Sequence, residues 1–222
     1  MPRLLMFDID GTLTATNDVD TRCYVQTLSE YLGCGIDDDW NHYQHVTDSG
    51  IASELLRKHD RPLSDIPLLR ERFVALIERE LQSSPGCCVE IAGAAKMVAR
   101  LRELPGVSVG LATGGWSGSA WAKLKCAGID AVGLPLAAAD DAESRTGIML
   151  HCREQAARRT VITETIYIGD GLRDAQAANE LGWQFIGVGS GDRAQQLRAA
   201  GAAHVWEDFR NQQAVLAAFG GS

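Results

Sequence analysis

The chain has 222 residues, of which 45% are hydrophobic and 23% are charged. This length fits one large domain, or a core with a smaller insert, that buries roughly 70–75% of its unfolded surface. The composition excludes a chain that is disordered or fibrous throughout. The formal net charge of −8 argues against a nucleic-acid partner, because an acidic chain repels a polyanion.

The N-terminal residues MPRLLMFDID become acidic at position 8, so their apolar run is too short for a secretory signal peptide. No apolar stretch approaches the roughly 18 residues that a membrane-spanning helix needs. The six cysteines form no C-x-x-C pair and favour free thiols in a reducing compartment. We therefore expect a cytoplasmic protein with no membrane partner, and the adjacent Cys87 and Cys88 leave a redox role open.

An apolar run from Leu4 to Ile9 predicts a buried strand near the start of the chain. Residues 18–83 then carry helical patterns and almost no β-branched runs, and we expect helices over 20–32, 49–58 and 64–81. The sequence thus predicts an all-helical cap over residues 16–85, inserted into a core made of residues 1–15 and 86–222.

From Ser84 onward, short apolar runs alternate with helical patterns. Strands are expected over 107–112, 131–136 (the weakest), 165–168, 184–188 and 203–205, and helices over 93–104, 117–127, 151–158, 173–181 and 193–200. This alternation predicts an α/β fold with a Rossmann-like parallel sheet, helices on both of its faces, and the helical cap as an addition.

Polar side chains follow three of the predicted strands. Asp8 and Asp10 end the first strand, Thr113 ends the second, and Asp170 and Asp174 follow another in the segment GDGLRD. The carboxyl ends of parallel strands meet at one edge of a sheet, where such folds bind their ligands. Clustered carboxylates repel one another unless a hard divalent cation is present, and oxygen ligands suit Mg²⁺.

These segments resemble the ordered motifs of the haloacid dehalogenase superfamily. The resemblance rests on FDIDGTLT, on the strand that ends in Thr113, and on IGDGLRDAQAANELG, which occur in the right order and on the right elements. It is strongest to the phosphatase branch, with phosphoglycolate phosphatase and β-phosphoglucomutase-like members, whose helical cap follows the first motif. It extends over essentially the whole predicted core.

The resemblance implies a role for each motif carboxylate. Asp8 would be the nucleophile that forms a phosphoaspartate. Asp10 would be the general acid–base. An Asp at this position disfavours a dehalogenase or a phosphonate-cleaving enzyme, because those branches of the superfamily carry a different residue here. Asp8, the backbone carbonyl of Asp10 and Asp170 would hold Mg²⁺, with Asp174 behind them or bound through water.

The second and third motifs would bind the transferring phosphoryl group. The Thr113 hydroxyl and the backbone N–H of Gly114 match the second motif, and an N-cap role for Thr113 is the structural alternative. The third motif needs a cation, and Arg145 is our choice for catalysis and substrate binding. If Arg145 is instead a surface residue paired with Asp141 or Glu143, then Lys123 or Lys125 is to be reconsidered.

The resemblance also implies that the cap closes over the site and contacts the substrate. The candidate contacts are Trp40, His42, His45, Thr47, Asp48 and Arg57. A metal site at His42 and His45 is disfavoured because no carboxylate support is evident, and the run Asp37–Asp39 is expected to be a solvated helix start. Trp116 is either a packed side chain or an aromatic wall of the cleft.

The sequence therefore predicts a Mg²⁺-dependent phosphatase that acts on a small phosphorylated metabolite. A phosphoglycolate-type ester, a sugar phosphate or a 5′-nucleotide all fit. Two alternatives remain: a phosphomutase of the β-phosphoglucomutase type, and a catalytically silent binding module with the same fold. Neither the substrate nor the oligomeric state can be read from the sequence.

Overall fold

A six-stranded parallel sheet forms the centre of the molecule in the computed structural model, which describes residues 2–218. Its strands are β1 (Arg3–Phe7), β2 (Val107–Ala112), β3 (Leu136–Ala137), β4 (Glu164–Gly169), β5 (Gln184–Val188) and β6 (His204–Trp206), in the spatial order β3-β2-β1-β4-β5-β6. The strand order reverses between β1 and β4, where Phe7 pairs with Ile168. A ligand crevice is expected at this reversal.

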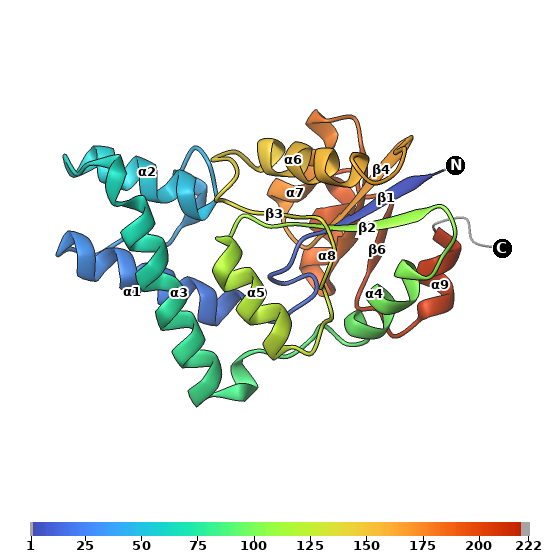
Figure 1. Ribbon diagram of the computed structural model, residues 1–222, viewed down its shortest axis with the longest axis horizontal. Helices are drawn as coiled ribbons and strands as arrows, with labels where there is room; N and C mark the ends of the chain where they lie inside the picture. The colour runs from blue at the N-terminus through green and yellow to red at the C-terminus, as the bar shows by residue number, and fades with distance from the viewer. Residues whose placement is uncertain (1, 219–222) are drawn as a thin grey trace.

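Helices cover both faces of the sheet and extend beyond one of its edges (Figure 1). They are α1 (Asn17–Leu32), α2 (Asp48–Lys58), α3 (Ile66–Ser83), α4 (Ala94–Arg102), α5 (Ser117–Cys126), α6 (Arg145–Ala157), α7 (Leu172–Glu180), α8 (Gly191–Ala199) and α9 (Gln212–Ala218), with short 3-10 turns at Trp40–His42, Leu63–Asp65 and Pro85–Cys87. Within residues 2–218, no helix is both long and apolar enough to cross a membrane.

The alternation of side chains along β1 supplies two hydrophobic layers. Leu4 and Met6 pack on one face, in the same cluster as buried residues of α6 and α7, while Leu5 and Phe7 pack on the other face with those of α4 and α5. All four side chains are fully buried. A strand that is apolar on both faces is typical of a parallel sheet covered by helices on both sides, so the α/β prediction is confirmed.

Helices α1, α2 and α3 gather at the end of the molecule toward which β1 runs (Figure 1). Helix α3 packs on α1 and also on α5 of the sheet region. Aromatic rings fill the space between them: Tyr24 lies edge-on to Phe73 at 5.5 Å and to Trp116 at 5.7 Å. The apolar core is therefore continuous from these helices into the sheet layers.

The structure corrects two predicted elements. The strand expected over 131–136 is only Leu136–Ala137, because the chain turns before it with Gly133 at φ +79° and Pro135 adds no N–H to a ladder. The helix expected over 151–158 begins six residues earlier at Arg145, because the Ser144 side chain accepts a hydrogen bond from Gly147 N–H as an N-cap. Helix α9 was not anticipated.

Candidate active site

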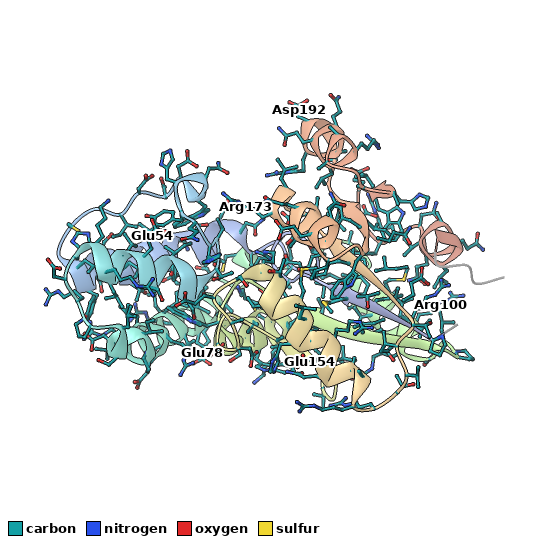
Figure 2. All side chains as sticks on the ribbon, turned by 90° about the horizontal axis from the view of Figure 1, so that it is seen from above. Glu54, Glu78, Arg100, Glu154, Arg173 and Asp192 are labelled. Carbon is teal, nitrogen blue, oxygen red and sulfur yellow. The ribbon has the colours of Figure 1, made fainter. Side chains whose placement is uncertain are left out.

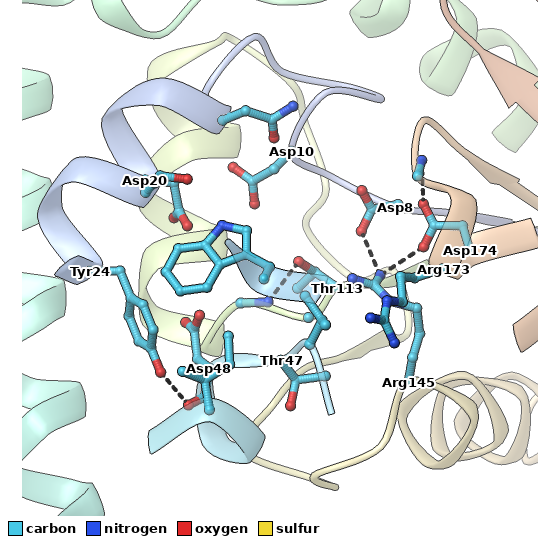
Figure 3. A pocket seen from close by; sticks show the side chains of 18 of the residues that line it. Asp8, Asp10, Asp20, Tyr24, Thr47, Asp48, Thr113, Arg145, Arg173 and Asp174 are labelled. Carbon is cyan, nitrogen blue, oxygen red and sulfur yellow. Dashed lines mark hydrogen bonds and ion pairs between the residues drawn. The ribbon is translucent and has the colours of Figure 1, made fainter. Parts of the chain in front are cut away.

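A cavity of about 220 Å³ lies where the sheet and helices α1 and α2 meet (Figure 3). Asp8 follows β1, Thr113 follows β2 and Asp170 follows β4, so three strand ends supply its floor. The lining residues are Asp8, Asp10, Asn17, Asp20, Thr21, Tyr24, Trp40, Val46, Thr47, Asp48, Ile51, Thr113, Gly114, Gly115, Arg145, Asp170, Gly171, Arg173 and Asp174. The structure thus brings together every residue that the sequence predicted for catalysis, phosphoryl binding and metal binding.

Arg145 joins two of the buried carboxylates. Its Nη1 atom lies 2.9 Å from Asp174 Oδ1 and 3.3 Å from Asp8 Oδ1, as the dashed lines in Figure 3 show. Arg145 is the first residue of α6, so the start of that helix brings the side chain to the cavity. Arg145 therefore does not form the surface pair with Asp141 or Glu143 that the sequence left open.

Three carboxylates form a group that suits a hard cation. Asp8, Asp170 and Asp174 each place one oxygen within 4.8 Å of the others. Asp174 Oδ1 is buried and has no partner with hydrogen-bond geometry, although Arg145 lies beside it. A buried, unsatisfied carboxylate oxygen in an all-oxygen donor set fits Mg²⁺.

Burial and mutual repulsion raise the pKa values of these acids. For Asp8, burial is the main cause and the charge of Asp174 adds to it, while Arg145 opposes both. Burial together with Asp174 raises the pKa of Asp170 to about 7, even though Asn17 donates a hydrogen bond of 3.3 Å to its Oδ2. The protein's own groups therefore offset only part of the repulsion among these buried carboxylates.

Two glycines make room for the functional side chains. A Cβ on Gly11, which has φ +76°, would lie 2.2 Å from Asp170 Oδ2. A Cβ on Gly114 would lie 2.7 Å from Arg145 Nη2. Any larger residue would displace a site carboxylate or the site cation, which explains the glycine at each position.

Asp10 is held by a buried cation from α5. Lys123 Nζ lies 2.8 Å from Asp10 Oδ1 and 2.6 Å from its Oδ2, and it also contacts Asp20 Oδ1 of α1 at 2.6 Å. Although burial alone would lower the pKa of Lys123, Asp10 and Asp20 raise it above its usual value. The Thr16 hydroxyl also donates to Asp10.

Lys123 is therefore a partner of Asp10 and not of Asp8, so the structure does not place it in the third-motif position considered as an alternative to Arg145. Lys125, the other alternative, is exposed and does not line the cavity. The metal role expected of Asp10 uses its backbone carbonyl, so the pairing of its carboxylate with Lys123 does not compete with that role.

Thr113 is buried, and its hydroxyl accepts a hydrogen bond of 3.1 Å from Gly115 N–H. The N-cap alternative for Thr113 is wrong, because α5 begins at Ser117 with Trp116 as its N-cap residue. Thr113 and Gly114 instead form a turn between β2 and α5 that faces the cavity. A turn of this kind directs polar groups toward an anion at a strand end.

The predicted cap contacts divide into two groups. Trp40, Thr47 and Asp48 line the cavity, whereas His42, His45 and Arg57 line a separate depression on the outer surface. His42 Nδ1 contacts Asp37 Oδ2 at 2.7 Å, which raises the pKa of His42. The Asp37–Asp39 run starts no α-helix: Asp39 caps the 3-10 turn at Trp40.

Trp116 is a packed side chain. It is fully buried, and its indole N–H donates to Ser49 Oγ at 2.8 Å. Its backbone N–H donates to Asp48 Oδ2 at 2.8 Å, so Trp116 fixes a cavity residue without lining the cavity itself. The aromatic-wall alternative is thus wrong for Trp116.

The cavity residues that were not singled out from the sequence include Asn17, Asp20, Tyr24 and Arg173. The first three lie three or four residues apart on α1, which places them on one helical face. That spacing was readable, but their direction depends on how α1 docks. Arg173 lies at the start of α7, and in Figure 2 it stands between helices α1–α3 and the sheet region.

Comparison with known proteins places this geometry in a family. The sequence matches the haloacid dehalogenase-like hydrolases over residues 5–188. No match was found among curated proteins.

Three solved structures with the same fold illustrate the relationship. A hydrolase from Pseudomonas syringae is 20% identical, with a TM-score of 0.73, 97% of this chain covered and 98% of the other. CbbY from Rhodobacter sphaeroides, solved with phosphate, is 23% identical, with a TM-score of 0.66 and coverage of 95% and 96%. A putative β-phosphoglucomutase from Bacteroides vulgatus is 16% identical, with a TM-score of 0.67 and coverage of 97% and 89%.

Proposed function

We propose that this chain, which belongs to the haloacid dehalogenase-like hydrolase family, is a Mg²⁺-dependent phosphatase of small phosphomonoesters. One observation carries the proposal: Asp8 is buried at the end of β1, within 3.3 Å of Arg145, and Asp10 two residues further on is held by Lys123. This arrangement combines a carboxylate nucleophile, a cation for the transferring group and a second carboxylate for proton transfer.

Asp8, Asp170 and Asp174, with the Asp10 carbonyl, would hold the metal. When bound, Mg²⁺ would offset the repulsion between the carboxylates and the phosphoryl oxygens. The approach of the three carboxylates to within 4.8 Å and the raised pKa values of Asp8 and Asp170 support this assignment.

Asp8 attacks phosphorus, so that a bond forms between its carboxylate oxygen and phosphorus while the ester oxygen departs. Asp10 donates a proton to that departing oxygen. A water molecule then attacks the phosphoaspartate, Asp10 takes its proton, and inorganic phosphate leaves. Lys123 Nζ and the Thr16 hydroxyl both donate to the Asp10 carboxylate, which holds that side chain in place for the two proton transfers.

Arg145 and Thr113 bind the transferring phosphoryl group. The Arg145 guanidinium lies beside Asp8, so it would stabilise the negative charge on the oxygens of the phosphoryl group that Asp8 attacks. We extend the proposal to the domain division, with residues 16–85 as the cap and residues 1–15 and 86–222 as the core. Cap residues Thr47, Ser49 and Ser53 bond to the loop that precedes α6, which excludes water from this edge of the cavity.

A phosphomutase is the second candidate, because a putative β-phosphoglucomutase shares the fold. A mutase has to rebind a bisphosphate, whose second phosphoryl group needs a cation at the far end of the cavity. The cavity residues that α1, α2 and the segment between them supply, within the described chain, include no Lys, Arg or His. This composition favours the phosphatase.

The proposal is tested by phosphate release from a panel of phosphorylated metabolites, with Mg²⁺ and with EDTA. Wild type and Asp8→Asn are compared on the same panel. We expect metal-dependent release by wild type and a loss of at least about a thousandfold in Asp8→Asn. Acid-quenched wild type should carry phosphate that hydroxylamine removes, as an acyl phosphate does.

Release that persists in Asp8→Asn would remove Asp8 as the nucleophile. Full activity in EDTA would remove the metal. Activation by a sugar bisphosphate, with isomerised product in place of free phosphate, would establish the mutase.

A further inference from the structure

We infer that the leaving group of the substrate carries a positively charged amine, and that the acidic and aromatic wall around Asp48, Tyr24 and Trp40 recognises it. The inference rests on the proposed function and deepens it by naming the substrate class: short aminoalkyl phosphomonoesters. Phosphoglycolate-type and bisphosphate substrates are disfavoured by the same wall.

The charged side chains of the cavity are separated into two ends. Arg145 and Arg173 both lie at the phosphoryl end, beside Asp8 and Asp174, as Figure 3 shows. Asp20, Tyr24 and Asp48 lie at the opposite end in the same view. A phosphomonoester whose phosphoryl group lies at Asp8 therefore directs its leaving group toward carboxylates and aromatic rings.

Asp48 is the carboxylate best placed to meet a ligand. It is the first residue of α2, it is buried, and its Oδ2 accepts the backbone N–H of Trp116 at 2.8 Å. Within the described residues Lys123 binds Asp10 and Asp20 but forms no ion pair with Asp48. Asp48 thus forms no ion pair among the described residues, although the charge of Lys123 is near enough to lower its pKa, and an ammonium group in the cavity would supply a direct partner.

The burial of Asp48 supports this reading. Burial raises its pKa well above the usual range, and the charge of Asp20 adds to that effect. A second anion brought next to it, such as a carboxylate or a phosphate, would meet repulsion from both acids. A bound ammonium would instead favour the ionised form of Asp48.

Two aromatic rings complete the wall. Tyr24 lines the cavity, and its hydroxyl is committed because it donates to the backbone carbonyl of Asp48. The Trp40 ring stands edge-on to it, with 6.1 Å between centroids and an interplanar angle of 67°. Aromatic faces beside a carboxylate attract an organic cation through the quadrupole of the ring.

The size of the cavity limits the leaving group. Its volume of about 220 Å³ is below the roughly 300–1,000 Å³ usual for drug-sized ligands. The phosphoryl group occupies part of that space, and the remainder matches a short chain better than a nucleoside. A two-carbon amine is therefore the appropriate probe.

The test uses three esters that differ only in the terminal group: 2-aminoethyl phosphate, 2-hydroxyethyl phosphate and carboxymethyl phosphate. We expect kcat/KM with Mg²⁺ to be at least about tenfold higher for the amine than for the alcohol, and lowest for the carboxylate. Equal values within about twofold, or a preference for the carboxylate, would overturn the inference.

Asp48→Asn isolates the recognising charge, because the amide oxygen can still accept the Trp116 N–H. The amine-to-alcohol ratio of kcat/KM should fall about tenfold in this variant. Asp18→Asn is the matched control: Asp18 is an exposed acid of α1 outside the cavity, so the ratio should stay at the wild-type value. An unchanged ratio in Asp48→Asn would contradict the assignment.

A binding measurement separates this inference from the proposed function. Asp8→Asn is titrated with the same three esters by calorimetry, and the amine should bind at least about tenfold more tightly than the alcohol. If wild type releases phosphate neither from these esters nor from any metabolite of the panel, the phosphatase proposal fails and the order of Kd values alone decides this inference. If release occurs without a preference for the amine, only this inference fails.

Discussion

At the scale of single residues, the two carboxylates of the first motif, Asp8 and Asp10, pair with different cations in this structure. Arg145 bridges Asp8 and Asp174, whereas Lys123 bridges Asp10 and Asp20. The two cations enter from different helices, α6 and α5. The nucleophile and the proton-transfer residue are therefore stabilised separately, which allows each to be tested by its own substitution.

Arg145→Ala should lower kcat by about a hundredfold to a thousandfold, the usual effect of removing a group that stabilises transition-state charge. Arg145→Lys should recover part of the loss, because it restores the charge without the planar fork. Arg158→Ala, an exposed arginine at the end of the same helix, is the control. A change of less than twofold in Arg145→Ala would show that another residue fills the third motif.

Lys123→Met should destabilise the fold by about 3–5 kcal/mol, because Asp10 and Asp20 would face each other without a buried cation. Urea unfolding measures the change, with Lys125→Met as the control two residues away on an exposed position. Adding Asp20→Asn to Lys123→Met should restore part of the stability, since it removes one of the two unpaired charges. Wild-type stability in Lys123→Met would contradict the assigned pairing.

At the scale of elements, the packing of α3 on α5 fixes the position of the cap helices relative to the sheet. The closest approach is at Gly118, where a Cβ would lie 2.8 Å from Val74 Cγ2. Arg70 of α3 also pairs with Asp140, whose other oxygen accepts the Ser117 N–H at the start of α5. Small residues and ion pairs thus hold α3 close to the turn that carries Thr113.

Gly118→Val should destabilise the protein by about 1–3 kcal/mol, because two β-branched side chains would compete for one space. Val74→Ala in the same chain should recover most of that loss, and Val74→Ala alone serves as the reference. Thermal unfolding with kcat and KM for each variant separates a loss of stability from a displaced cap. A Gly118→Val protein as stable as wild type would mean that α3 and α5 are not packed this tightly.

At the scale of the whole molecule, the acidic site makes stability depend on pH and on metal. The native pKa of Asp170 is about 7, above the value near 3.8 for an unperturbed carboxyl. Between these two values the native state holds the proton that the unfolded state has released. The free energy of unfolding of the metal-free protein therefore falls as the pH rises through this window.

Without metal, the free energy of unfolding should fall less between pH 5 and pH 8 in Asp170→Asn than in wild type, because the variant has no carboxyl to ionise there. The difference between the two falls should be about 2–3 kcal/mol. Urea unfolding in EDTA at several pH values measures both slopes. Added Mg²⁺ should stabilise wild type more at pH 8 than at pH 5, since the ligands must be ionised to bind it. Parallel slopes for the two proteins would contradict the raised pKa of Asp170.

The α/β core and most of its elements could be predicted because their patterns are local. Apolar runs, helical spacing and glycine-flanked strand ends are properties of neighbouring residues, and they located Asp8, Asp10, Thr113 and Asp170 at one sheet edge. The exceptions are one short strand and the start of one helix. Strand β3, which lies beside a proline, and the early start of α6 depended on turn geometry that the periodicity of the sequence does not encode.

The sequence by itself thus determined the order of the motifs, the class of fold and the acids that converge. Tertiary structure alone decided their partners: that Arg145 lies at Asp8, that Lys123 lies at Asp10 and Asp20, and that Asp48 forms no ion pair within residues 2–218. Spacing along the chain fixes which face of a helix a side chain occupies, whereas its contacts depend on how helices far apart in sequence dock. The charge of the acidic and aromatic wall around Asp48, Tyr24 and Trp40 follows from that docking.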